Sequence, residues 1–140
     1  MIMTQEHKEL LLKDLCARLP YRIKGFAEHG VFKGIVTLRN INIDNDCQPI
    51  ACYNNYGSLH VKVSEFKPYL FPLSSMTEEQ RKELQELHFD YISDEIFNDT
   101  EFVYHYDCMH LIDWLNKNHF DWRGLIPLDL AIDATGLEIY

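Results

Sequence analysis

The stretch from Asp113 to Ile126 constrains this chain more than any other part of its sequence. It reads Asp-Trp-Leu-Asn-Lys-Asn-His-Phe-Asp-Trp-Arg-Gly-Leu-Ile and contains both tryptophans, Trp114 and Trp122, within nine residues. Because aromatic side chains bury large areas, a small domain is expected to build its core around such a pair. The stretch predicts the end of a helix, a sharp turn at Arg123-Gly124 and an apolar segment that folds back.

The N-terminal segment, residues 1–19, is predicted to form a helix. Thr4 is a favourable N-cap, and leucines recur at helical spacing as far as Leu19. Pro20 ends this helix, because the residue before a proline disfavours the α conformation. A helix of this length is not stable alone, so its leucine face is expected to pack on the rest of the domain.

Residues 20–66 are predicted to form an antiparallel meander of four or five short strands. From Tyr21 onward apolar and polar residues alternate, and polar turns separate the alternating runs. The expected strands begin at Tyr21 and then cover residues 31–38, with 40–44 as an extension or a further strand, 49–53 and 59–66. Gly34 is a candidate β-bulge or a point of close approach between backbones. Such a meander forms either a small curled sheet or an SH3-like partial barrel.

Residues 67–76 are interpreted as a proline-containing connector between two halves of the domain. Pro68 and Pro72 each lack an amide donor and disturb a strand ladder or a helix interior. The segment is therefore expected to follow an extended, polyproline-like path and not to form a central strand.

Residues 77–140 are predicted to be mainly helical. Thr77 and Gln80 have the spacing of a capping box, which begins a surface helix that runs to about residue 87. A last helix is expected over residues 106–118, with short helical turns or one extended piece in residues 88–105. The chain is thus predicted to be a single α+β domain, a small antiparallel meander followed by a helical C-terminal half.

The net charge of -9 is unevenly distributed along the chain. Residues 71–140 contain fifteen acidic and four basic residues, whereas residues 21–70 contain six basic and four acidic ones. An acidic half repels a phosphate backbone, so a protein target fits it better than nucleic acid does. The N-terminus lacks a signal peptide and no apolar run is long enough to span a bilayer, so we expect a cytoplasmic location.

A group of metal-ligand residue types lies at His105, Cys108 and His110, with His119 further along the chain. On a continuous helix Cys108 and His110 point about 160° apart, and no second ligand pair matches them. Histidines scattered along an aromatic-rich helix are more often packing or surface residues. We therefore predict no metal site.

Cys108 with His119 and either Asp113 or Asp121 supplies the residue types of a cysteine nucleophile, a base and an orienting acid. However, Cys108 falls in the apolar stripe of the predicted helix, where a thiol is usually inert. The four cysteines contain no C-x-x-C pair and are expected to be free and mostly buried. No catalytic residue and no cofactor is predicted.

The leading functional hypothesis is a non-enzymatic module that binds another, unknown protein. The alternative is a nucleic-acid-binding module that uses the basic sheet of residues 21–66 as a phosphate and stacking surface. Its candidate residues are Arg22, Lys24, Lys33, Arg39, Lys62 and Lys67, with Tyr21, Phe32, Tyr53 and Tyr56. Alternating basic residues are also common on the exposed face of an ordinary sheet.

Three segments carry a resemblance to a known group of sequences. They are DLCARLPY at residues 14–21, KPYLFPLSSMTEE at residues 67–79 and WLNKNHFDWRGLI at residues 114–126. Together they resemble an uncharacterised family of small proteins carried by phages and conjugative elements of anaerobic gut bacteria. Trp122 stands where the family pattern has a tyrosine. The resemblance extends over most of the chain and implies a mobile-element accessory protein, with no catalytic residues to carry over.

Within the third segment, His119, Trp122 and Arg123 are the candidate interaction or structural-motif residues. We interpret the segment as structural, because it combines a helix end, a turn and large apolar side chains. The exposure of His119 and Arg123 in the folded chain tests this interpretation.

Overall fold

The structure of the protein is a computed structural model that describes residues 3–45, 47–86 and 109–140. The expectations for residues 88–105, for the start of the last helix and for His105 and Cys108 lie outside these ranges.

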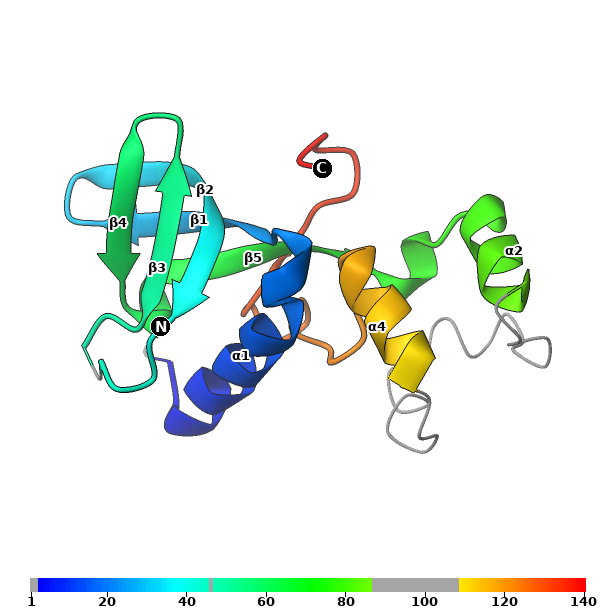
Figure 1. Ribbon diagram of the computed structural model, residues 1–140, viewed down its shortest axis with the longest axis horizontal. Coiled ribbons are helices and arrows are strands. Elements are labelled where there is room, and N and C mark those ends of the chain that lie inside the picture. The colour runs from blue at the N-terminus through cyan, green and yellow to red at the C-terminus, as the bar shows by residue number, and fades with distance from the viewer. Residues whose placement is uncertain (1–2, 46, 87–108) are drawn as a thin grey trace.

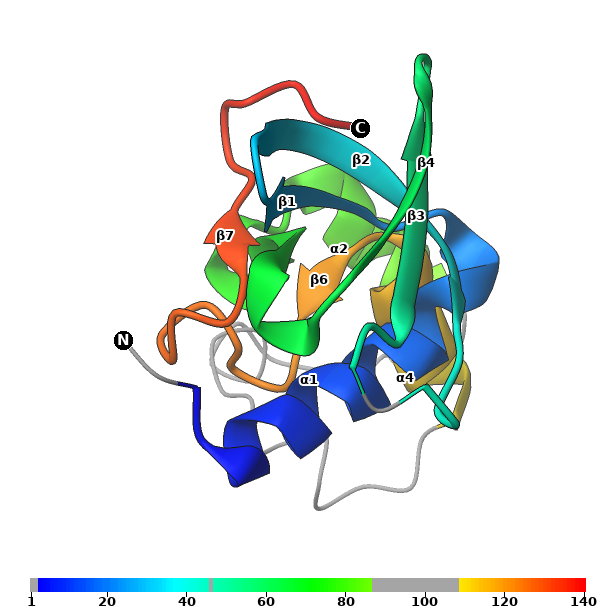
Figure 2. The same ribbon diagram turned by 90° about the vertical axis from the view of Figure 1, so that its left-hand side faces the viewer.

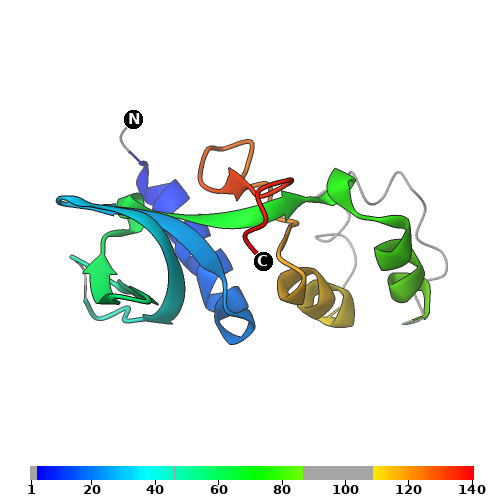
Figure 3. The same cartoon turned by 90° about the horizontal axis from the view of Figure 1, so that it is seen from above.

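The described residues form a mixed α+β fold, as the sequence predicted (Figure 1). A curled sheet lies at one end of the molecule, and helices α2 (Glu78–Glu86) and α4 (Met109–Lys117) lie at the other. Helix α1 (Gln5–Arg18) lies between them, and one long strand runs from the sheet toward the helices (Figure 3).

The strands of the meander are β1 (Lys24–His29), β2 (Phe32–Ile41), β3 (Ile50–Asn54), β4 (Gly57–Val61) and β5 (Phe66–Pro72). Successive strands β1 to β4 pair antiparallel, and β1 also pairs antiparallel with β5, which gives the order β4-β3-β2-β1-β5. A short 3-10 helix, Val63–Glu65, leads into β5. The β3–β4 hairpin crosses β2 at a steep angle (Figure 2), so the sheet is curled.

Local signals placed the helix starts correctly. The Thr4 hydroxyl accepts a hydrogen bond from the His7 amide at 3.1 Å, which confirms the predicted cap of α1. At α2 the Thr77 amide donates to Gln80 Oε1 at 2.9 Å and the Gln80 amide donates to Thr77 Oγ1 at 3.2 Å. These reciprocal bonds confirm the predicted capping box.

The predicted start of the first strand was wrong. Tyr21 belongs to a 3-10 helix, Leu19–Tyr21, and Arg22 has a left-handed φ of 54°. Pro20 lies inside this short helix, where its fixed φ is compatible with the backbone, so β1 begins only at Lys24.

Two further strand details differ from the prediction. The expected strand 59–66 is interrupted by the 3-10 helix Val63–Glu65, so it is shared between β4 and β5. The β-bulge is not at Gly34, which pairs regularly with Ala27. The register of β2 against β3 shifts between Leu38 and Asn40 instead.

The expectation that the proline-containing segment is not a central strand was wrong. Strand β5 pairs antiparallel with β1, and it pairs in parallel with β6 (Phe120–Asp121) and β7 (Ile132–Asp133). Its prolines lie where the ladder changes partner. Pro68 is in the last pair with β1, and Pro72 is the final residue of the strand, beside Asp121. A proline is tolerated at such ladder ends, because a lost donor there breaks no continuous run of bonds.

The interior contains two hydrophobic clusters. The first lies between α1 and the curled sheet and includes Leu11, Leu15 and Phe66, each fully buried. The second lies between α2, α4 and the end of β5 and includes both tryptophans. The stretch from Asp113 to Ile126 contributes to both, because Leu125 packs in the first cluster. The aromatic-rich stretch therefore joins the helices to the sheet.

Candidate functional site

The aromatic-rich stretch encloses a buried group of charged side chains. Arg18 and Asp14 are fully buried on α1, and Asp121 is only 4% exposed. Arg18 Nε donates to Asp14 Oδ2 at 2.8 Å, and its Nη2 donates to the Phe120 carbonyl at 2.6 Å. Arg123 Nε lies 3.2 Å from Asp14 Oδ1, at an ion-pair distance without hydrogen-bond geometry. Two cations and two anions thus balance each other inside the fold.

The carboxylate of Asp121 holds the turn that follows it. It accepts hydrogen bonds from the Leu125 amide at 2.8 Å and from the Ile126 amide at 2.9 Å. Burial raises the pKa of this carboxyl group, against the opposing effect of these amides and of Arg18. Both carboxylate oxygens are engaged by the backbone, so Asp121 has a structural role.

The candidate residues Trp122 and Arg123 make their contacts within the chain. Trp122 is 4% exposed, and its indole Nε1 donates to Asn116 Oδ1 at 2.7 Å. The Arg123 guanidinium lies 4.1 Å from the centroid of the Trp122 ring, and its side chain is 9% exposed. Cation–π contact and ion pairing therefore hold Arg123 against the interior.

His119 directs the chain out of α4 and into β6. It has a left-handed φ of 64°, and its ring stacks on Tyr140 with a centroid distance of 3.7 Å. Burial lowers the pKa of His119 to about 4, with further lowering from the nearby charges of Arg18 and Lys24. Its Nδ1 has no hydrogen-bond partner among the described residues. All three candidate residues thus face the interior, which fits the structural interpretation.

The residues considered for catalysis are only partly described, because Cys108 lies outside the described residues. His119 stacks on Tyr140, whereas the carboxylate of Asp121 is bonded to backbone amides. His110 is exposed on α4. Residues 3–45, 47–86 and 109–140 contain no group of three His, Cys, Asp or Glu side chains placed to hold a metal ion.

The cysteines correct one expectation. Of the three described, Cys16 and Cys47 are exposed and only Cys52 is buried, so the thiols are not mostly buried. Burial raises the pKa of the Cys52 thiol to about 11. Cys16 is not among the α1 residues of the first hydrophobic cluster.

Several basic residues of the sheet are bound within the chain. Lys24 Nζ donates to the Ile139 carbonyl at 2.9 Å, and Lys67 Nζ donates to Asp129 at 2.9 Å. The Arg39 guanidinium lies 5.1 Å from the Tyr53 ring centroid. Of these three contacts, the ion pair between Lys67 and Asp129 is the one that offsets a positive charge of the sheet.

At the end of the sheet formed by the β1–β2 and β3–β4 turns, large apolar side chains are exposed beside a cavity. The β1–β2 turn contains Gly30, whose φ of 59° suits the first loop residue of a type II′ hairpin, followed by the fully exposed Val31. At the tip of the β3–β4 hairpin Tyr56 is 98% exposed. A largely apolar cavity of about 480 Å³ lies between these hairpins. We call it the hairpin hollow, and it is lined by His29, Phe32, Asn54, Tyr56, Gly57, Ser58 and Leu59.

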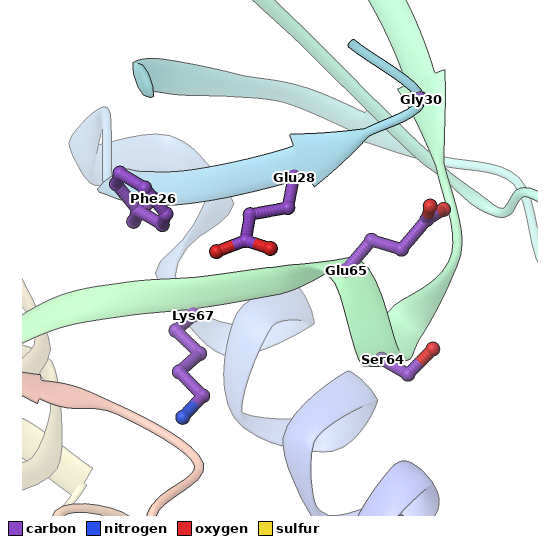
Figure 4. Close-up of a pocket in the computed structure, with 6 residues that line it drawn as sticks. All are labelled: Phe26, Glu28, Gly30, Ser64, Glu65 and Lys67. Carbon is purple, nitrogen blue, oxygen red and sulfur yellow. The ribbon is translucent and has the colours of Figure 1, made fainter. Parts of the chain in front are cut away.

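A second cavity of about 510 Å³ lies next to it, where β1 diverges from the 3-10 helix before β5. We call it the outer hollow, and it is lined by Phe26, Glu28, Gly30, Ser64, Glu65 and Lys67 (Figure 4). The Glu28 side chain reaches from β1 toward β5, whereas the Lys67 side chain extends away from it (Figure 4). His29 lines the hairpin hollow and Glu65 lines the outer hollow, and His29 Nδ1 lies 3.0 Å from Glu65 Oε2.

Glu65 is held by neighbours on both sides. Its Oε1 accepts a hydrogen bond from the Lys62 amide at 2.8 Å, and its other oxygen pairs with His29. Although burial opposes the effect, the bonds from Lys62 and His29 lower the pKa of this carboxyl group. The pair of His29 and Glu65 is therefore a polar contact between the linings of the two hollows.

Sequence reasoning did not identify either hollow. It assigned Phe32 and Tyr56 to a possible stacking surface for nucleic acid. The hollow was missed because residues from two different hairpins share no sequence spacing that marks a common cavity. Among the described residues, no helix has the length and apolar content needed to cross a bilayer. Compared with known proteins, the chain has no match among protein-family models, curated proteins or solved structures.

Proposed function

We propose that this chain is a non-enzymatic module that binds another protein, and that the end of the sheet around the hairpin hollow is its binding surface. The observation that carries the proposal is the apolar hollow between two hairpins, with Tyr56 exposed in its lining and Val31 exposed at the β1–β2 turn. The resemblance to proteins of phages and conjugative elements adds the proposal that it serves such an element as a cytoplasmic accessory protein.

Large exposed apolar residues beside a cavity are typical of a protein interaction site. Tyrosines contribute strongly to interfaces, because the ring buries a large area while the hydroxyl group keeps a polar contact. Val31 and Tyr56 have few contacts with the fold, and they are on hairpins that the sheet holds in place. A rigid scaffold that presents apolar side chains at its tips supports a role in binding.

The aromatic-rich stretch does not offer a comparable surface. Trp114 and Trp122 are 6% and 4% exposed, and Arg123 is drawn into the interior by Asp14. A partner would have to disrupt the second hydrophobic cluster to reach these side chains. The hairpin end is thus favoured over the stretch that dominates the sequence.

A site-specific photo-crosslinking experiment tests the proposal. A photoreactive phenylalanine analogue would replace Tyr56 in one sample and the exposed Leu137 in a matched control, each expressed in a native host. We expect a defined crosslinked protein from position 56 that is missing from position 137. The same products from both positions, or none from position 56, would contradict this binding surface.

The salt dependence of binding distinguishes the alternative function, nucleic-acid binding, from protein binding. Binding through phosphate contacts weakens steeply as the salt concentration rises. A crosslink at position 56 that persists at high salt favours a protein partner, whereas retention of DNA or RNA only at low salt favours the basic sheet.

A further inference from the structure

Strand β4 is the outermost strand of the sheet (Figure 1). It pairs with β3, and no other strand of the described residues pairs with its outer edge. An open edge offers unbonded backbone donors and acceptors to another extended chain. The binding surface proposed above lies along this edge, because three residues of β4 also line the hairpin hollow.

The register identifies the backbone groups that face outward. In an antiparallel ladder, alternate residues of a strand bond to opposite neighbours. The Asn42 amide donates to the Pro49 carbonyl at 2.8 Å, so the odd-numbered residues of β3 bond toward β2. Its even-numbered residues bond toward β4, where their partners are Gly57, Leu59 and Val61. The amide and carbonyl groups of Ser58 and His60 therefore point away from the sheet.

This edge lacks the features that usually block strand addition. Natural edge strands carry charged side chains, prolines or bulges that discourage pairing. The sequence of β4, Gly-Ser-Leu-His-Val, contains no Lys, Arg, Asp, Glu or Pro, and its register against β3 is regular. Ser58 and His60 are exposed, so a neighbouring strand meets no steric cover from these residues.

We propose that the partner protein binds as an extended segment that adds to β4 as a further strand and places one apolar side chain in the hairpin hollow. This inference rests on the proposed function and specifies its mode of binding. Ser58 and His60 each supply one donor and one acceptor to the added strand. The side chains along the added strand alternate between the hollow and solvent, because successive residues of a strand point to opposite faces.

Charge complementarity indicates which segment fits. Because β4 contains no Lys, Arg, Asp or Glu, a charged residue placed opposite it loses water without gaining one of these as a counter-ion. The hollow is lined mainly by apolar surface from Phe32, Tyr56 and Leu59. The segment is therefore uncharged where it faces β4, and its residue above the hollow is apolar.

The experiment uses a library of random 12-residue peptides displayed on phage as the probe, selected against the full chain. A selected peptide is then synthesised as a series in which each backbone amide in turn is N-methylated. Strand addition predicts a loss of affinity of about tenfold or more at every second position, because only alternate amides face β4. Docking through side chains alone gives no such alternation.

Two variants of the protein provide the complementary test. His60→Pro removes an outward donor that the native ladder does not use, so the fold is expected to persist and peptide binding to fall about tenfold or more. His60→Thr keeps the donor and is expected to bind within about twofold of the original chain. If His60→Pro does not fold, the N-methylated series decides alone.

The outcomes separate the two proposals. If no peptide is enriched and position 56 gives no crosslink, both the binding surface and the strand addition are overturned. If peptides bind but show no alternation, or bind His60→Pro equally well, strand addition is overturned while the binding module stands. If the chain itself dimerises and His60→Pro abolishes the dimer, the occupant is a second copy, which overturns the assignment to a separate partner.

Discussion

The two ends of the sheet differ in how they use their residues. At the closed end, β5 is flanked by β1, β6 and β7, and the charged side chains of Asp14, Arg18 and Arg123 are held inside the fold. At the open end, β4 has an unpaired edge among the described strands, and Tyr56 stands almost fully in solvent. Polar groups are thus buried at one end, while apolar groups are exposed at the other.

The difference between the two ends indicates that one end stabilises the fold and the other is available for binding. The buried charges of Asp14, Arg18 and Arg123 pair with one another and fix one arrangement of α1, β6 and the following turn. Exposed apolar side chains add little to stability and are available for contact. We therefore expect substitutions at the closed end to unfold the protein and those at the open end to leave it folded.

The largest expected effect is that of Arg18→Met. The change leaves Asp14 buried with only Arg123 nearby and removes the donor to the Phe120 carbonyl. Breaking a buried ion pair costs about 3–5 kcal/mol. Urea unfolding followed by tryptophan fluorescence measures the loss. The control is Arg39→Met, the same substitution at an exposed arginine, for which a loss below about 1 kcal/mol is expected. Equal losses would show that the buried pair has no special role.

A smaller effect is expected from Gly25→Ala, where β1 passes close to β5. A Cβ atom at Gly25 would overlap the Phe66 ring, which is itself fully buried. Because the ring has little room to move, we expect a loss of about 1–3 kcal/mol in the free energy of unfolding. The control is Gly34→Ala on β2, where an added Cβ atom would lie 3.6 Å from the Phe32 ring, an ordinary contact distance. A stability change within about 0.5 kcal/mol is expected there.

The next effect is a pH dependence that depends on His119. Burial lowers its pKa from 6.5 to about 4 in the folded chain, so between these values the unfolded state binds more protons. Stability therefore rises with pH from about 4 to 6.5 and is lost as the pH falls through this range. Converted in full, this pKa difference corresponds to a loss of ~3 kcal/mol in the free energy of unfolding. Because the ring is partly exposed, we expect a smaller loss of about 1–2 kcal/mol.

His119→Asn isolates this contribution, since asparagine also tolerates the left-handed φ of 64° and does not titrate. Urea unfolding at pH 7 and at pH 5 compares the two proteins. The original chain is expected to lose more stability between these pH values than the variant does. An equal loss in both would assign the pH dependence to other groups.

The structural features that the sequence predicted correctly depend on residues close together in the chain. Thr4 and the Thr77–Gln80 pair mark helix starts through bonds between residues three apart, and the structure has both. Asp14 and Arg18 have the spacing of an ordinary helical ion pair. Their burial follows from Phe120, more than one hundred residues away in the sequence, and no local pattern contains that information.

The parts that it did not predict are non-local. The prolines of β5 argue against a strand locally, but two parallel strands from the C-terminal segment complete its ladder. Strands β6 and β7 have only two residues each, too few to show any alternation. The hairpin hollow arises from two hairpins that are more than twenty residues apart, so its lining is visible only in the fold.

The smallest expected effect on stability is that of Tyr56→Ala. The side chain is 98% exposed, so the free energy of unfolding is expected to change by less than about 0.5 kcal/mol. Tyr69→Ala at the closed end, where the ring is 6% exposed, provides the contrast and is expected to cost about 3 kcal/mol or more. Affinity for a peptide selected on the original chain is expected to fall about tenfold or more in Tyr56→Ala, because an exposed aromatic at the rim of a hollow contributes mainly to binding. Unfolding curves and peptide titrations of the same samples measure both quantities. If Tyr56→Ala lost stability but kept peptide affinity, the open end would belong to the scaffold, and the division between the two ends would fail.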